Sequence, residues 1–420
     1  SKVDSHVEIS TSRSLVAEIC WLLEMNTHGE HVLASTTASL GEFATSSTKQ
    51  KIIQKPSSAL SDDEENTAEL RTPYAVLPST DIFDGAGLRP VYAVDCGGSL
   101  VKVVYTSLEE SEESKETQTR LKFRKFLKIE HCLAFIKAHA IARGCEQIEG
   151  PIRCTGGGAY KYGRLIAETL RVEVERVDEM EALVSGCCFL LKYIEDESFT
   201  YHHEEEPNKR YKYRPIDPMV MCPFQLVNIG TGVSVIKIED ENTFARIGGS
   251  TMGGGAFTGL GLLLTSAKSF DELLTKAEKG DHRNVDVLVS DIPLATKDKL
   301  RLPDDLIAGS FGKCVDQGRR DELHKRRPQS EDDMTKSLLL MFSNCIGQMA
   351  TLYGKQHEVK RIYFGGYFIR KHPITMRTIS FAVNYWSKGE IEALFLKHEG
   401  YIGAVGAFLR HMRTSKKKDE

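Results

Sequence analysis

The sequence lacks the features that would mark several common classes of protein. Its ten cysteines include no pair spaced as Cys-x-x-Cys, so it shows no zinc-site pattern. Most of them lie within apolar runs, as Cys187 and Cys188 do, and are therefore expected to be reduced thiols of the core. The formal net charge of −4 provides no overall basic field, so we expect no nucleic-acid partner.

Long apolar runs are absent as well. No stretch of about 18 uninterrupted apolar residues occurs, so we expect no membrane span. The N-terminal residues show no basic region followed by an apolar core and a cleavage site, and the expected location is therefore cytoplasmic. Because the chain begins at Ser1 rather than Met, a targeting segment preceding it remains an alternative.

The sequence does contain enough apolar material for a large core. Of its 420 residues 41% are apolar, and strand-like runs alternate with helix-like ones, which predicts an α/β fold in two lobes. Residues 1–75, rich in Ser, Thr, Glu and Lys, are expected to form a disordered extension. We expect the folded body over residues 76–410, with lobe 1 at about 76–222 and lobe 2 at about 223–410, before a charged tail at 411–420.

The most informative motif is the segment Tyr92–Lys102, in which an apolar strand leads Asp95 into a glycine turn. Gly97 and Gly98 carry no side chain that would keep phosphate oxygens away from backbone N–H groups, and Lys102 adds a positive charge. The motif predicts a phosphate-binding turn. An ordinary strand turn with the same letters is the alternative that this motif alone leaves open.

Two similar turns follow further along the chain. Phe224–Ser234 repeats the plan with an apolar run, a polar residue and a Gly-Thr-Gly turn, and Arg361–Tyr367 ends an apolar run in paired glycines. Three such turns indicate a duplicated nucleotide-binding architecture, in which two halves bind phosphate and the last pair of glycines lies beside the nucleoside. The glycine-dense segment Arg246–Gly261 opens an apolar helix, which favours phosphate contact over a close helix crossing.

Eight segments, in chain order, resemble the type II (eukaryotic) pantothenate kinases: DCGGSLVKVVY, CTGGGAYKY, LVNIGTGVSV, GGSTMGGGAFTGLG, FDELL, GSFGK, YFGGYFIR and YWSKGEIEALFLKHEGYIGAVGAFL. The resemblance covers about Leu77 to Leu409. Within the family, IRKHPITMRTISF and GEIEALFLKHEGY are most similar to the pantothenate kinase 4 branch, whose members often carry a C-terminal phosphatase domain. We expect no such domain within residues 1–420, and a phosphatase domain that follows Glu420 is the alternative left open.

The resemblance implies the two-lobed fold shared by acetate kinase, heat-shock chaperone ATPases and actin, with duplicated phosphate-binding halves. It implies ATP-dependent phosphorylation of pantothenate to 4'-phosphopantothenate, the first step of coenzyme A biosynthesis, with Mg²⁺ accompanying ATP and acyl-CoA as feedback inhibitor. A homodimer, or a heterodimer with a related pantothenate kinase, is expected. The alternative is a weakly active or inactive scaffold subunit of the same fold that binds nucleotide or acyl-CoA.

The family pattern also assigns site residues. It makes Glu179 the general base, although without the resemblance a solvated charge cluster on a helix would be the favoured interpretation. Arg246 would hold the pantothenate and phosphate end of the site, and Asp95 would organise Mg²⁺, through water. Vertebrate members of the pantothenate kinase 4 branch resemble pseudokinases that have lost the glutamate and the arginine, so their presence here favours a competent kinase.

The remaining site residues that the resemblance implies fall into two groups. The nucleotide-binding residues are Asp95, Gly97, Gly98, Ser99, Lys102, Gly253, Gly254, Gly255, Gly365 and Gly366, and the pantothenate-binding residues are Thr231, Ser234 and Arg246. Thr231 stands where serine is usual in the family. The chain also departs from the family after Ile292, where Pro293–Lys297 replaces a Tyr-Gly-Gly turn, and this departure favours the scaffold alternative.

Overall fold

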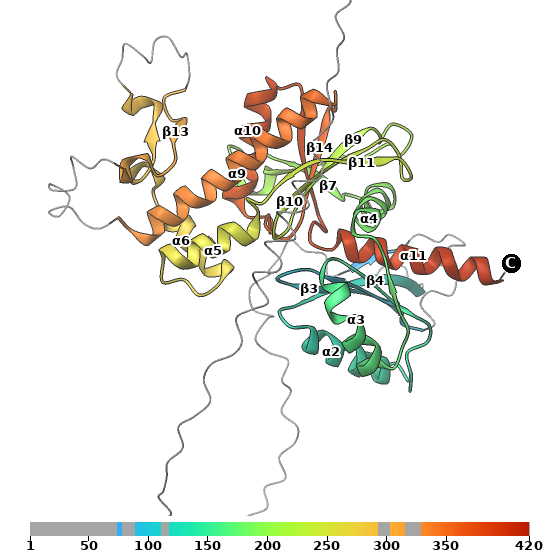
Figure 1. Ribbon diagram of the computed structural model, residues 1–420. Coiled ribbons are helices and arrows are strands. Elements are labelled where there is room, and N and C mark those ends of the chain that lie inside the picture. Colours follow the sequence, from blue (N-terminus) through green and yellow to red (C-terminus); the bar gives the residue numbers. More distant parts are fainter. Residues whose placement is uncertain (1–73, 78–88, 111–116, 293–302, 316–328, 420) are drawn as a thin grey trace, which may run out of the picture. The chain divides into compact units, whose positions relative to one another are not determined.

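The computed structural model describes residues 74–77, 89–110, 117–292, 303–315 and 329–419 (Figure 1). Residues 1–73 of the predicted extension and the departure at Pro293–Lys297 lie outside the described residues. All described residues belong to the compact unit Asn66–Glu420. Within these ranges, the helices include none whose length and apolar content suffice to cross a membrane.

Two mixed sheets organise the chain. Across the first sheet the strands run in the order β1 (Tyr74–Val76), β4 (Thr117–Phe126), β3 (Val101–Glu110), β2 (Tyr92–Cys96), β5 (Ile152–Thr155) and β6 (Val174–Arg176). Across the second they run in the order β11 (Phe244–Ser250), β10 (Val233–Ile238), β9 (Phe224–Ile229), β14 (Arg361–Gly365), β15 (Glu392–Leu396), β7 (Ser198–Tyr201) and β8 (Tyr211–Tyr213).

Five strands of each sheet share one plan. In the first sheet β2, β3 and β4 pair antiparallel, and β5 and β6 continue from β2 in parallel. In the second, β9, β10 and β11 pair antiparallel, and β14 and β15 continue from β9 in parallel. Helix α3 (Gly158–Leu170) corresponds to α10 (Pro373–Ser387), and α4 (Glu179–Tyr193) to α11 (Ile402–Asp419). The repeated plan confirms the predicted two-lobed α/β fold with duplicated halves.

The remaining elements are insertions and crossovers. α2 (Ile129–Ala142) connects β4 to β5 in the first half. The corresponding connection of the second half is longer and comprises α5 (Gly254–Leu264), α6 (Phe270–Lys279), η2 (His282–Asn284), β12 (Val287–Leu288), η3 (Val289–Asp291), β13 (Ile307–Gly309), η4 (Gly312–Cys314) and α9 (Glu331–Gln356). The short helix η1 (Pro207–Lys209) lies between β7 and β8.

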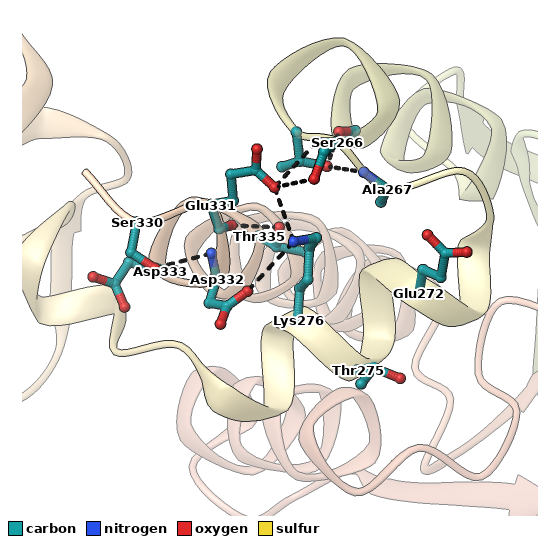
Figure 2. Close-up of polar contacts among 12 residues, drawn as sticks. Ser266, Ala267, Glu272, Thr275, Lys276, Ser330, Glu331, Asp332, Asp333 and Thr335 are labelled. Carbon is teal, nitrogen blue, oxygen red and sulfur yellow. Dashed lines mark hydrogen bonds and ion pairs between the residues drawn. The ribbon is translucent and has the colours of Figure 1, made fainter. Parts of the chain in front are cut away.

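A polar cluster fixes α5 and α6 to the start of α9 (Figure 2). The carboxylate of Glu331 accepts hydrogen bonds from the Ser266 hydroxyl at 2.7 Å and pairs with Lys276 at 2.8 Å. These partners lower the pKa of Glu331 to about 2. The Ser330 hydroxyl caps α9 by accepting from the N–H of Asp332 at 3.1 Å. The helix that begins in the glycine-dense segment is therefore tied to the longest helix of the lobe.

The core forms three apolar layers. The inner layer joins the facing sides of both sheets to α4 and α11, and the outer layers pack α2 and α3 on the first sheet and α5, α6, α9 and α10 on the second. Strand alternation produces this division, since Ala93 of β2 belongs to the inner layer and Val94 to the outer one. Each fully buried Leu or Phe contributes about 1.5–3 kcal/mol of transfer free energy.

Two strands that precede the lobe boundary predicted at about 222 belong to the second sheet. Strand β7 pairs with β15 through Phe199↔Phe395 and Ser198↔Leu396, and β8 pairs with β7, so both belong to the second sheet. The second sheet thus draws its first strand in chain order from Ser198–Tyr201. The segment after β7 is polar because it forms the edge of a sheet, where charged side chains such as Lys212 protect the unpaired strand.

Candidate active site

The first phosphate-type turn forms as the sequence predicts. β2 carries Asp95 and β3 carries Lys102 directly opposite it, with Lys102 Nζ 3.0 Å from Asp95 Oδ2 and both side chains 15% exposed. The N–H of Gly97 donates to the carbonyl of Leu100 at 3.0 Å, which closes a tight turn between the strands. Ser99 is exposed at its tip. The turn thus presents backbone, a hydroxyl and an ion pair at one end of the sheet.

The second turn, between β9 and β10, faces the first. A Cβ built on Gly98 would lie 3.1 Å from Thr231 Oγ1, so a residue of each turn touches the other. The N–H of Gly230 donates to the carbonyl of Gly232 at 2.9 Å. The structure therefore brings together two motifs that lie more than a hundred residues apart in the chain. The binding role predicted for Gly97, Gly98 and Thr231 remains a prediction.

The glycines at the start of α5 serve the second turn directly. The N–H of Gly254 donates to the carbonyl of Gly230 and that of Gly255 to the carbonyl of Thr231, each at 2.9 Å. A Cβ on Gly253 would lie 2.6 Å from the carbonyl carbon of Gly232. Close backbone packing thus accounts for all three glycines. The N–H groups of Gly254 and Gly255 donate to the second turn and are not directed at a phosphate. The nucleotide contact predicted for Gly254 and Gly255 would therefore have to use atoms of these residues other than their N–H groups.

The paired glycines after β14 are also held closely. Gly366 has a φ of +94°, donates its N–H to the carbonyl of Glu399 at 2.7 Å, and would place a Cβ 2.3 Å from the carbonyl oxygen of Ile229. A Cβ on Gly365 would lie 2.5 Å from Ile402 Cδ1. Gly366 thus requires glycine, because its φ is positive and its neighbour is backbone, whereas a side chain at Gly365 would require Ile402 to move. Close packing around both positions also accounts for the glycines, and their place beside the nucleoside remains a prediction.

Glu179 lies at the first turn of α4, where the side chain of Asp178 caps the helix by accepting from Met180 N–H at 2.9 Å and Glu181 N–H at 3.0 Å. Glu179 is an exposed residue by its solvent-accessible surface. Burial raises its pKa, the charges of Asp95 and Asp178 raise it further, and Lys102 lowers it. The predicted base therefore lies within electrostatic range of the first phosphate-type turn.

Ser234 and Arg246, predicted to bind pantothenate, come together through the β10–β11 hairpin. Ser234 lies opposite Gly249 in the register, and a Cβ on Gly249 would lie 2.5 Å from Arg246 Nη2. The exposed guanidinium of Arg246 therefore crosses Gly249 beside Ser234. Gly249 was not assigned from the sequence. Its signal was its place in the glycine-dense segment, three residues after Arg246.

Thr155 and Gly156 lie next to Asp95 and were not assigned from the sequence. Thr155 lies opposite Asp95 in the parallel β2–β5 pair and is 1% exposed. Its buried hydroxyl has no hydrogen-bond partner among the described residues. Gly156, with a φ of +82°, would place a Cβ 2.7 Å from Asp95 Oδ1. An unused hydroxyl beside a carboxylate is the oxygen-rich setting that suits Mg²⁺ and its water ligands, so these residues fit the implied ion. The signal was the glycine run of CTGGGAYKY.

Comparisons with known proteins give relatives for this chain. Its residues 91–410 match the model of the Fumble family. It is 44% identical over 361 residues to the 4'-phosphopantetheine phosphatase of Mus musculus, with 80% of this chain and 42% of the mouse protein covered. It is 44% identical over 332 residues to pantothenate kinase 1 of Arabidopsis thaliana, with 75% and 84% covered.

The chain spans less than half the length of several of these relatives. The chain spans 42% of the mouse protein and 40% of each of the pantothenate kinase 2 proteins of Arabidopsis thaliana and Oryza sativa. Among solved structures, a ROK family glucokinase from Streptomyces griseus in complex with glucose and AMPPNP gives a TM-score of 0.37 at 15% identity, over 76% of this chain and 97% of that one. The family match and the Arabidopsis thaliana relative, however, show that the chain belongs to the Fumble family of pantothenate kinases.

Proposed function

We propose that the chain phosphorylates pantothenate with ATP to give 4'-phosphopantothenate, the first step of coenzyme A biosynthesis. The observation that carries the proposal is the position of Glu179, within electrostatic range of Asp95 and Lys102 where the two glycine turns face each other. Relatives named pantothenate kinase, from Arabidopsis thaliana and Schizosaccharomyces pombe, support the substrate.

In this proposal each residue has a distinct task. Glu179 accepts the proton of the attacking pantothenate hydroxyl, and Arg246 holds oxygens of pantothenate or of the transferred phosphate. Lys102 contributes positive charge to the nucleotide phosphates, and Asp95 and Thr155 would hold Mg²⁺ through water. When bound, Mg²⁺ offsets negative charge on the phosphates. Positioning and charge, rather than covalent chemistry by the protein, then accelerate the transfer.

The direct test is product formation. The purified chain is incubated with Mg²⁺, ATP and labelled pantothenate, and labelled 4'-phosphopantothenate is measured. We expect turnover that depends on both ATP and pantothenate. A folded chain that binds ATP and forms no product would contradict the proposal.

A second candidate is a nucleotide-binding subunit with little turnover. It is favoured by one observation, the 44% identity to a mouse protein that is named as a phosphatase rather than a kinase. Under this alternative, ATP would bind the isolated chain with ordinary affinity, and turnover would appear only when a second pantothenate kinase is added. The same assay, run with and without such a partner, separates the two candidates.

We further propose, from family membership alone, that the chain acts in the cytoplasm as a dimer, with itself or with a related kinase, and that acyl-CoA inhibits it. Light scattering of the purified chain tests whether it forms a dimer with itself. Assays of turnover with acyl-CoA at varied ATP test the inhibition, and competition with ATP is the expected pattern.

The pH dependence of turnover should follow the charges around Glu179. A base must be ionised to act, so kcat/KM falls as the pH drops through the pKa of Glu179, which burial, Asp95 and Asp178 raise and Lys102 lowers. Asp178→Asn removes one negative charge while keeping a side chain that caps α4 well. We expect the acidic limb of kcat/KM to move to lower pH in this variant. An unchanged or upward-shifted limb would contradict Glu179 as the titrating base.

A further inference from the structure

A row of polar side chains crosses the first sheet at the level of Asp95. Asp95 of β2 lies opposite Thr155 of β5 on one side and Lys102 of β3 on the other, and Lys102 lies opposite Lys125 of β4. Residues opposite one another in a sheet point to the same face. Ala93, two residues before Asp95, belongs to the inner apolar layer, so the whole row lies on the face directed at the second lobe.

The two lysines of this row are not equivalent. Lys102 forms an ion pair with Asp95 at 3.0 Å, whereas the ammonium of Lys125 contacts the hydroxyl of Tyr367 and lies 4.9 Å from the centre of its ring. Tyr367 is a neutral partner, and within the described residues no carboxylate lies at ion-pair distance from Lys125. Like charges directly opposite each other on neighbouring strands destabilise a sheet. The arrangement therefore carries a cost that a bound anion would remove.

The contact also has a defined place in the site. Tyr367 immediately follows Gly365 and Gly366, the glycines predicted to lie beside the nucleoside, so Lys125 reaches from the first lobe to the nucleoside end of the second. The other cation at this ring, Arg370, lies 4.1 Å from its centre but is paired with Asp271. Among these cations Lys125 is thus the one whose charge has no anionic partner in the described part of the chain.

We propose that Lys125 binds the phosphate groups of the nucleotide and that Tyr367 is the positioning residue that holds it. This inference rests on the proposed function, because it places ATP between the two glycine turns. A triphosphate carries more negative charge than Lys102 offsets while Lys102 remains paired with Asp95. Lys125 supplies a second ammonium from the same row, and its contact with Tyr367 restricts the side chain before the ligand arrives.

The competing explanation is that Lys125 and Tyr367 only link the two lobes. The two explanations differ in which ligand senses the charge. Loss of a phosphate contact would weaken the affinity for ATP but not for adenosine. Loss of a structural link would lower the stability of the chain and weaken the affinity for both ligands alike. Lys125→Met removes the charge and keeps an apolar stem, and it also relieves the repulsion of Lys102.

The experiment measures affinity for ATP by calorimetry and for adenosine by competition, together with the unfolding midpoint of the ligand-free full chain. For Lys125→Met we expect the Kd of ATP to rise about 10- to 100-fold, as for loss of one charged hydrogen bond, and the Kd of adenosine to change less than about twofold. The ligand-free midpoint should equal or exceed that of the wild type. Lys125→Arg should restore ATP affinity to within about threefold, because it retains the charge.

Lys122→Met is the matched control, since Lys122 lies on the same strand opposite Tyr105, on the other face of the sheet. It should leave both affinities unchanged. Equal losses for ATP and adenosine, or a lowered ligand-free midpoint in Lys125→Met, would overturn the inference, as would a wild type that binds no ATP. A wild type that binds ATP without phosphorylating pantothenate would contradict the proposed function, and the affinity comparison would still decide the role of Lys125.

Discussion

Glu179→Gln is expected to lower kcat for pantothenate phosphorylation by about 10²- to 10⁴-fold, the usual contribution of a general base. Glutamine keeps the shape of the side chain but cannot accept the hydroxyl proton. Its amide also removes a negative charge from the neighbourhood of Asp95, so the Kd of ATP should stay the same or decrease. Steady-state kinetics with varied pantothenate, and calorimetry with ATP, measure the two effects separately.

A neighbouring glutamate provides the control for this variant. Glu181 lies in the same first turn of α4, but its carboxylate pairs with Arg410 at 2.6 Å, on another side of the helix from the site. Glu181→Gln should therefore change kcat less than about threefold, since exposed pairs contribute little. Two glutamates with equal losses would indicate a general effect on α4. A fully active Glu179→Gln would exclude it as the base.

The parts of the site that the sequence predicts best are those encoded within one hairpin. Asp95 and Lys102 flank a short glycine turn, so strand geometry alone places them opposite each other, as the 3.0 Å ion pair confirms. The recurrence of that turn at Gly230 likewise predicts the second half of the fold, because a repeated motif at a strand end indicates a repeated unit. Local chemistry and duplication were sufficient here.

The parts that the sequence does not predict depend on pairing between distant segments. Thr155 becomes a neighbour of Asp95 only because β5 adds in parallel beside β2, and Lys125 joins the row only through the register of β3 and β4. A run of glycines in the sequence likewise does not show whether it binds a ligand or packs against a distant segment of the chain. Gly254 and Gly255 look identical in the sequence whether they bind a phosphate or, as the structure has them, donate to the second turn.

The crossing of α4 and α11 explains two further glycines and gives the last prediction. A Cβ on Gly406 would lie 1.8 Å from the carbonyl oxygen of Ala182, and one on Gly186 would lie 2.0 Å from that of Ile402. Glycine within a helix costs about 1 kcal/mol relative to alanine, so both positions sacrifice helix stability for close approach. The site depends on this approach, because Gly403 of α11 would place a Cβ 3.3 Å from Asp95 Oδ2 and α4 carries Glu179.

Gly406→Ala is therefore expected to lower the free energy of unfolding by about 3 kcal/mol or more, since the added methyl meets backbone that has no rotamer to escape into. Urea denaturation followed by circular dichroism measures the change. Gly259→Ala is the control, because Gly259 lies within α5 with nothing within 4 Å of its Cβ, and it should be neutral or stabilise by about 0.5–1 kcal/mol. Wild-type stability in Gly406→Ala would mean that the helices cross further apart, which would also move Gly403 away from the carboxylate of Asp95.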